Sequence, residues 1–403
     1  MNSKGEPKKL IAVLFAFSLV VRLLVLAIFP APALDDSARI YLAAAHLLMD
    51  GKGFGDPSFP FYNPPLYSVF IAMCLSMFGD DQVSVKVVQT FADSLTIVLV
   101  YFIMREIFDI ETGLLSAGIL CLYPYSIYLT TSIASEPLFT LFLSGFVLST
   151  LYSVRSDQVW YYCASGVLVG LATLIRATTQ FVPLLFLVML LLVRERGREL
   201  LFCYTAFFLS FALVVLPWTI RNYVVLDDFI PVGTSGGVVM LQGSSEKFLT
   251  IDGKPDMLRA YSPLEGNKPS QNDRFFMRAA LERNKIHLQT DPIGFVAFMA
   301  RKFFRLWYAT ESGSNHNIIL FSQIPVYIFA LAGLVLAWMK NKSLAWIPLC
   351  AIVYFAVLHW LSLPLFRYMM PIMPYVIGFG AFAIATLRNE WIIGKKIIRV
   401  VNE

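Results

Sequence analysis

Charged residues are scarce in this sequence, and their scarcity sets the class of protein. They make up 15% of its 403 residues, against 58% for hydrophobic residues. A soluble protein of this length could not bury so much apolar surface, so soluble classes are excluded. The hydrophobic residues form long continuous runs instead of alternating with polar ones, which favours membrane-spanning helices. The sequence predicts an all-α polytopic membrane protein.

The residue patterns that hold metals, nucleotides or nucleic acids are also missing. The five cysteines lie in apolar runs without zinc or thioredoxin spacing, so we expect no disulfide bond. The four histidines form no ligand pair of the HExxH kind. The glycine-rich stretches at 51–55 and 233–243 lack the lysine and hydroxyl residues of a P-loop. The residues alone therefore identify no cofactor and no metal site, and they exclude a nucleic-acid partner.

About ten apolar runs approach the roughly 20 residues that a helix needs to cross a bilayer. They are residues 10–29, 83–104, 113–129, 137–154, 159–175, 181–193, 200–217, 318–339, 344–361 and 368–387. A further run, residues 65–79, would rise only about 22 Å as a helix, whereas the hydrocarbon core is about 30 Å thick. We expect it to lie in the outer interface.

The distribution of lysine and arginine orients the chain. With residues 65–79 left out of the count, the basic clusters fall on one side, which the positive-inside rule assigns to the cytoplasm. Both termini are then cytoplasmic, and the first apolar run is an uncleaved signal anchor. Residues 1–403 form a single transmembrane domain with a first outer loop at 30–82 and a long outer loop at 218–317.

The long outer loop has one stretch that indicates membrane contact. It begins with β-like or turn-rich sequence broken at Gly236 and Gly237, and an amphipathic helix is expected over residues 273–290. A stripe of phenylalanines at 295–306 then runs beside Arg301, Lys302 and Arg305. Apolar and basic residues on one helix predict an interfacial helix that touches anionic lipid.

Three acidic residues on the outer side are candidates for chemistry. The first outer loop opens on Asp35 and Asp36, and the expected topology places Glu136 on the same face. Ionisable groups close to hydrocarbon are costly and mark functional sites. Each also has a structural interpretation, because Asp caps helices and an acid is favoured at a helix N-terminus.

Arginines at the outer ends of spans are the second group of candidates. Arg176, Arg221 and Arg367 occupy such positions, where positive charge is not the topological default. A guanidinium group suits phosphate, whereas snorkelling to lipid headgroups is the structural alternative. Arg22 and Asp93 lie at similar depth in the first two spans, and we expect them to pair as a structural contact.

Several short motifs, in this order, resemble a known superfamily. They are DSARIYLAAAHLLMDGKGF, NPPLY, SEPLFTLFL, GLATLIRAT and FRYMMPIMP. This series resembles the GT-C integral-membrane glycosyltransferases, in particular the protein O-mannosyltransferases and the lipid A aminoarabinose transferases. The resemblance implies a GT-C-type helical bundle with juxtamembrane helices in its first outer loop. It also implies an inverting transfer of sugar from a polyprenyl-phosphate donor to a glycan, lipid or protein acceptor, at the outer face of a bacterial inner membrane.

The resemblance also implies roles for residues. Asp36 matches the catalytic base, with Asp35 as the alternative because Ile40 stands where an aromatic residue is usual. Glu136 matches the acid of the second outer loop, which orients the base or binds sugar hydroxyls. The candidates for binding the donor phosphate are Arg176, Arg221, Arg367, Asn63 and Tyr67, although some relatives carry a lysine near the position of Asn63.

Some questions stay open at this level. Relatives differ in metal dependence, so a divalent cation is neither required nor excluded. The sugar, the acceptor and the oligomeric state cannot be derived from the residues. A transporter or flippase of a lipid-linked glycan is the alternative function, since it explains the spans and the outer charges. It does not explain a long first outer loop that carries acids.

Overall fold

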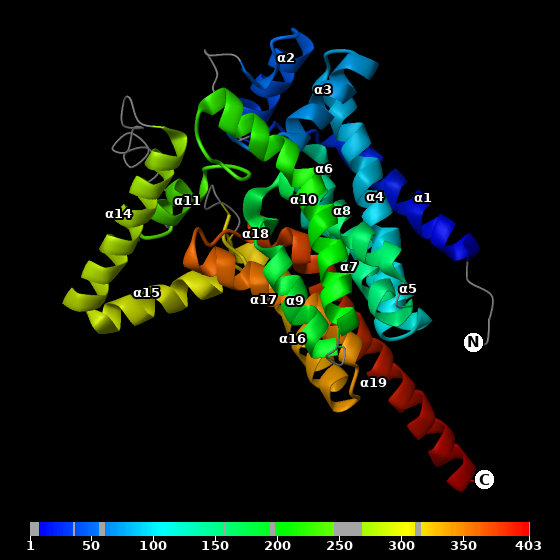
Figure 1. The fold of residues 1–403 in the computed structure, drawn as a ribbon. Coiled ribbons are helices and arrows are strands. Elements are labelled where there is room, and N and C mark those ends of the chain that lie inside the picture. The colour runs from blue at the N-terminus through cyan, green and yellow to red at the C-terminus, as the bar shows by residue number, and fades with distance from the viewer. Residues whose placement is uncertain are drawn as a thin grey trace.

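The computed structural model describes residues 8–34, 37–55, 61–156, 158–193, 198–245, 268–310 and 316–402. Every secondary-structure element in these ranges is a helix, so the all-α prediction is confirmed. Figure 1 shows one helical bundle, with α14 and α15 standing to one side of it. The protein is a polytopic membrane protein.

Within the described ranges, seven helical segments are long and apolar enough to cross a membrane. They are built on α1 (Lys8–Ile28), α4 (Gln82–Ile107), α7 (Glu136–Ser156), α10 (Arg198–Leu226), α16 (His316–Met339), α17 (Trp346–Leu361) and α19 (Met373–Asn402). Short turns lead into the last two, namely η5 (Ser343–Ala345), α18 (Phe366–Met369) and η6 (Met370–Ile372). The remaining predicted spans are also helical, but each is broken or short.

The predicted span at 113–129 is a bent pair rather than one helix. α5 (Ile110–Cys121) and α6 (Pro124–Thr131) meet at an angle of 51°, and together they would make an eighth span. Pro124 begins α6, because a proline has no amide hydrogen to continue the preceding helix. α8 (Val159–Ile175), the turn η3 (Ala177–Thr179) and α9 (Val182–Val193) form the shorter apolar helices that follow.

The described residues of the segment predicted as the first outer loop include short helices at one end of the bundle (Figure 1). They are η1 (Ser37–Leu42), α2 (Ala43–Met49), η2 (Gly53–Gly55) and α3 (Leu66–Phe78). A helix as short as α3 rises about 20 Å, too little to cross the hydrocarbon core, as the sequence predicts for this run. Gly51 and Gly53 have φ angles of 75° and 65°, which glycine adopts without steric cost.

The long outer loop contributes three described helices, α11 (Gly236–Gln242), α14 (Pro269–Thr290) and α15 (Pro292–Arg305). The helices predicted over residues 273–290 and 295–306 are confirmed as α14 and α15, and the interfacial position of the second stays a prediction. The expected break at Gly236 is wrong, because α11 starts there and the amide of Gly237 donates to Asp273 Oδ1 at 2.6 Å. The lipid contact expected for Lys302 is also wrong, since that side chain is buried.

Small residues let some helices approach closely. A methyl group on Gly166 of α8 would lie 2.2 Å from the carbonyl oxygen of Phe207 in α10. One on Gly333 of α16 would lie 1.8 Å from the carbonyl oxygen of Phe379 in α19. In a membrane, helices associate through such close packing, because lipid supplies no hydrophobic force between them. These contacts set the relative positions of the helices and therefore of the helix ends that carry the candidate residues.

Candidate functional site

A buried carboxylate lies between two arginines where three helices end or begin. Glu136 starts α7, Arg176 follows α8, and Arg367 belongs to α18. Arg176 Nη1 donates to Glu136 Oε1 at 2.6 Å, and Arg367 Nε forms an ion pair with the same oxygen at 2.9 Å. All three side chains are largely buried. We call these three residues the arginine cluster.

The local sequence explains how each member reaches the cluster. Glu136 occupies the first turn of α7, where the helix dipole favours a negative charge. It therefore also has the structural role of an acid at a helix N-terminus, as the sequence allowed. Arg176 leaves α8 in an extended conformation and also donates from Nη1 to Ser135 Oγ at 3.1 Å. α18 is held by the amide of Phe366, which donates to the carbonyl of Ala309 at 2.8 Å.

Aromatic rings frame the two guanidinium groups. The ring of Tyr368 lies 5.2 Å from Cζ of Arg176 and 5.4 Å from Cζ of Arg367, within the range of cation–π attraction. His359, at the end of α17, stacks on Tyr368 with 4.9 Å between ring centroids. Its buried Nδ1 has no hydrogen-bond partner in the described part of the chain. His359 belongs to no sequence motif, so only the structure associates it with this cluster.

The arginine cluster brings two guanidinium groups to one carboxylate. Guanidinium groups stay protonated in proteins, and their planar fork of donors matches the oxygens of a phosphate or carboxylate. The cluster is therefore suited to bind an anionic group. Tyr41 of η1 is close enough to Arg176 to influence it electrostatically, which places the first outer loop beside the cluster.

The segment that leads to Asp35 and Asp36 runs alongside the segment that leads to Glu136. The amide of Ala31 donates to the carbonyl of Thr131 at 3.1 Å, and that of Leu34 donates to the carbonyl of Ile133 at 3.4 Å. Asp35 and Asp36 themselves lie outside the described residues.

A single glutamine connects these segments to the first outer loop. Gln89 of α4 is fully buried; its Nε2 donates to the carbonyl of Ser132 at 2.8 Å, and its Oε1 accepts from the hydroxyl of Tyr67 at 2.5 Å. The ring of Tyr67 meets that of Tyr41 edge to face at 5.2 Å. One turn earlier on α4, Lys86 Nζ donates to the carbonyl of Ala31 at 2.8 Å. Sequence reasoning missed Gln89, because a lone amide in an apolar helix has no motif partner.

Arg221 and Asn63 lie in a different environment from the arginine cluster. Arg221 Nη1 donates to the carbonyl of Phe61 at 2.7 Å, and its guanidinium lies 4.7 Å from the ring of Trp218. A methyl group on Gly233 would lie 3.6 Å from Cα of Asn63. Arg221 thus contacts the second half of the first outer loop, to which Asn63 itself belongs. The structure brings Arg176, Arg367 and Glu136 together, but Arg221 has no described contact with them.

The described residues contain no group of three His, Cys, Asp or Glu side chains placed to hold a metal ion. Asp35 and Asp36 lie outside the described residues. A divalent cation is therefore neither required nor excluded, as was the case from the sequence alone.

Known proteins resemble this chain in sequence pattern and in fold. Residues 62–220, less than half of the chain, match the family described as dolichyl-phosphate-mannose-protein mannosyltransferase. The structure superposes on the archaeal oligosaccharyltransferase AglB from Archaeoglobus fulgidus, in complex with an inhibitory peptide and a dolichol-phosphate, with a TM-score of 0.61. The two share 14% identity, and the match covers 97% of this chain and 51% of AglB. The chain has a GT-C fold.

Other comparisons agree with the GT-C fold or add little. The apo form of the same oligosaccharyltransferase gives a TM-score of 0.61 at 14% identity, over 98% of this chain and 52% of that one. ArnT from Cupriavidus metallidurans bound to undecaprenyl phosphate gives 0.48 at 13% identity, over 94% and 78% of the two chains, which is too weak for an argument. No curated protein matches the chain in sequence. The chain spans about half the length of AglB, so the likeness concerns the fold alone.

Proposed function

We propose that this protein is a glycosyltransferase that moves a sugar from a polyprenyl-phosphate-linked donor to an acceptor hydroxyl. The observation that carries the proposal is the arginine cluster, in which two largely buried guanidinium groups lie beside the first outer loop. A guanidinium group is a permanently charged planar donor that suits a phosphate. The name of the family matched by residues 62–220 and the dolichol-phosphate bound to AglB fit such a donor.

The reaction is a single displacement with inversion. The acceptor oxygen attacks the anomeric carbon while the bond from that carbon to the phosphate oxygen breaks, and the electron pair leaves with the polyprenyl phosphate. Asp36, or Asp35 as the alternative, takes the proton from the acceptor hydroxyl; such help accelerates reactions about 100- to 10,000-fold. The position of Leu34 beside Ile133, three residues before Glu136, supports an acid near the cluster.

The arginines act on the leaving group. Arg176 and Arg367 bind the carrier phosphate and stabilise the charge that grows on it as the bond breaks. Glu136 holds both guanidinium groups in place, and His359, whose buried Nδ1 has no hydrogen-bond partner among the described residues, packs on Tyr368 beside them.

Arg221 and Asn63 would contact a part of the donor away from the cluster, on the side of the first outer loop. Tyr67 is buried and bonded to Gln89, so it would act on the donor site through its neighbour Tyr41.

The setting is a bacterial inner membrane, with both termini in the cytoplasm and the site on the periplasmic or extracellular side. The basic clusters that flank the spans support this orientation. The acceptor is a glycan, lipid or protein hydroxyl on the outer face.

Transfer from short-chain polyprenyl-phosphate sugars by the purified protein tests the proposal. We expect labelled sugar to leave the carrier with the wild type and not with Asp36→Asn. Asp80→Asn is the matched control, because Asp80 is an exposed acid of the same outer loop. Turnover by Asp36→Asn at the wild-type rate would show that Asp36 is not the base and would favour Asp35. Carrier bound without sugar release, equally in all variants, would favour a transporter.

A further inference from the structure

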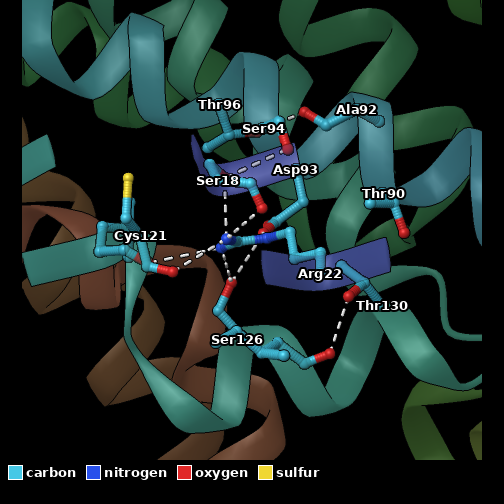
Figure 2. Close-up of polar contacts among 12 residues, drawn as sticks. Ser18, Arg22, Thr90, Ala92, Asp93, Ser94, Thr96, Cys121, Ser126 and Thr130 are labelled. Carbon is cyan, nitrogen blue, oxygen red and sulfur yellow. Dashed lines mark hydrogen bonds and ion pairs between the residues drawn. The ribbon is translucent and has the colours of Figure 1, made fainter. Parts of the chain in front are cut away.

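A second buried charge network lies deeper in the bundle, and the proposed reaction does not use it. Arg22 of α1 and Asp93 of α4 form an ion pair with 2.6 Å between Nε and Oδ2. Figure 2 shows the guanidinium group enclosed by polar groups of α1, α4 and the α5–α6 bend. Arg22 Nη1 donates to Ser18 Oγ at 2.8 Å and to the carbonyl of Cys121 at 3.1 Å. Ser126 Oγ donates to Asp93 Oδ2 at 2.9 Å.

A small cavity separates this network from the arginine cluster. Its volume is about 20 Å³, and it is lined by two acidic residues (Asp93, Glu136), three hydroxyl-bearing ones (Thr96, Ser126, Thr140) and five apolar ones. A cavity needs about 10–15 Å³ to hold one water, and cavities that stay dry are lined by apolar groups. This cavity has the size for one water molecule, and half of its lining residues are polar.

Glu136 supplies an unsatisfied acceptor at the cavity. Its Oε1 faces Arg176 and Arg367, whereas its buried Oε2 has no hydrogen-bond partner among the described residues. A buried acceptor without a partner costs about 1–3 kcal/mol, and more when it is charged. Two ionised carboxylates only accept hydrogen bonds, so the group that joins them must donate twice. A water molecule does so.

We propose that the cavity holds one water that bridges Asp93 to Glu136, and that Asp93 is a positioning residue for the arginine cluster. Arg22 fixes Asp93, the water fixes Oε2 of Glu136, and Oε1 is thereby kept toward both arginines. The part of this inference that concerns activity depends on the proposed function, because it predicts how well a carrier phosphate is bound. The water itself does not depend on that function.

Two paired replacements test the role of Asp93. Asp93→Asn alone would leave Arg22 buried without a counter-charge, so both residues are changed together. Arg22→Met/Asp93→Leu removes the acceptor for the water, whereas Arg22→Gln/Asp93→Asn retains an amide oxygen for it. We expect the first pair to raise KM for the polyprenyl-phosphate sugar about tenfold with a smaller change in kcat, and the second pair to restore most of the affinity. Fewer folded molecules would lower the apparent kcat and leave KM unchanged.

A cavity-filling variant tests the water directly, with Arg22 and Asp93 intact. Thr96→Leu places extra carbon atoms in the cavity, and Thr96→Val is the matched control of nearly the same size as threonine. We expect a high-resolution density map of the wild type and Thr96→Val to show a peak within hydrogen-bond distance of both carboxylates, and Thr96→Leu to lack it and to show the raised KM. A wild-type map without that peak, or wild-type KM in both Thr96→Leu and Arg22→Met/Asp93→Leu, would overturn the inference. If the wild type transfers no sugar, the proposed function fails, and the map alone decides on the water.

Discussion

Glu136 contributes both to the proposed chemistry of the site and to the stability of the fold. Its carboxylate pairs with both Arg176 and Arg367, and all three side chains are largely buried. Breaking a buried ion pair by removing one partner costs about 3–5 kcal/mol, because the remaining charge loses a compensating charge. Here one removal would weaken two ion pairs.

We expect Glu136→Gln to lower the thermal unfolding midpoint of the detergent-solubilised protein strongly, by the equivalent of about 3–5 kcal/mol. The amide keeps the size of the side chain and removes only its charge. Asp227→Asn is the control, because Asp227 forms an exposed ion pair with Lys268 and asparagine tolerates its φ of 47°. Equal midpoints for the two variants would contradict the assigned role of Glu136.

At the scale of elements, close helix packing determines where the outer ends of the spans lie. α8 delivers Arg176, and α8 packs on α10 through Gly166 and Gly170. α4 contacts neighbouring segments through one polar face, which carries Lys86, Gln89 and Asp93. The spacing of these three residues corresponds to one side of a helix. α4 therefore holds the exit of α1, the approach to α7 and, through Tyr67, the start of α3.

Gly166→Ala tests whether the close approach of α8 and α10 is required. The added methyl would lie 2.2 Å from the carbonyl oxygen of Phe207, so the helices must move apart. Overpacking of this kind costs about 1–3 kcal/mol, which a lowered unfolding midpoint reports. Gly118→Ala in α5 is the control, because nothing lies within 4 Å of the added methyl there. We expect it to be neutral or slightly stabilising, since alanine favours helix; a Gly166→Ala midpoint equal to it would refute the packing argument.

At the scale of the whole molecule, the long outer loop is attached to the bundle through α15. Lys302 is buried there, its Nζ lies 3.2 Å from the carbonyl oxygen of Leu361 in α17, and Trp360 donates to the carbonyl of Met299 at 2.8 Å. Burial lowers the pKa of Lys302 to about 8. The attachment thus contains an ionisable group whose charge is costly in the folded state.

The stability of the protein should therefore depend on pH through Lys302. In the unfolded chain the lysine has a pKa of about 10.4, so between about pH 8 and 10 the unfolded state binds more protons and stability rises with pH. Lys302→Met removes this cost. We expect the free energy of unfolding of Lys302→Met to exceed that of the wild type by up to roughly 3 kcal/mol at pH 7. This difference should shrink as the pH rises toward 10. The bond to Leu361 is lost at every pH, so unfolding midpoints compared across pH isolate the charge; a difference that does not vary with pH would contradict the prediction.

The sequence by itself determined the class of protein, the positions of the helices and the pairing of Arg22 with Asp93. These follow from local hydrophobicity, from helix length and from the cost of a charge in hydrocarbon, each of which acts on residues in place. The motifs that resemble the GT-C glycosyltransferases also led to the fold that the comparison with AglB shows.

Only the tertiary structure decided which outer charges meet. No residue pattern places Arg176 and Arg367, but not Arg221, beside Glu136, and none assigns a role to Gln89 or His359. The sequence also pointed Lys302 toward lipid, whereas packing on α17 buries it. The physical reason is the same in each case. Contacts between helices far apart in the chain depend on which faces pack together, and close approach at residues such as Gly166 and Gly333 sets those faces.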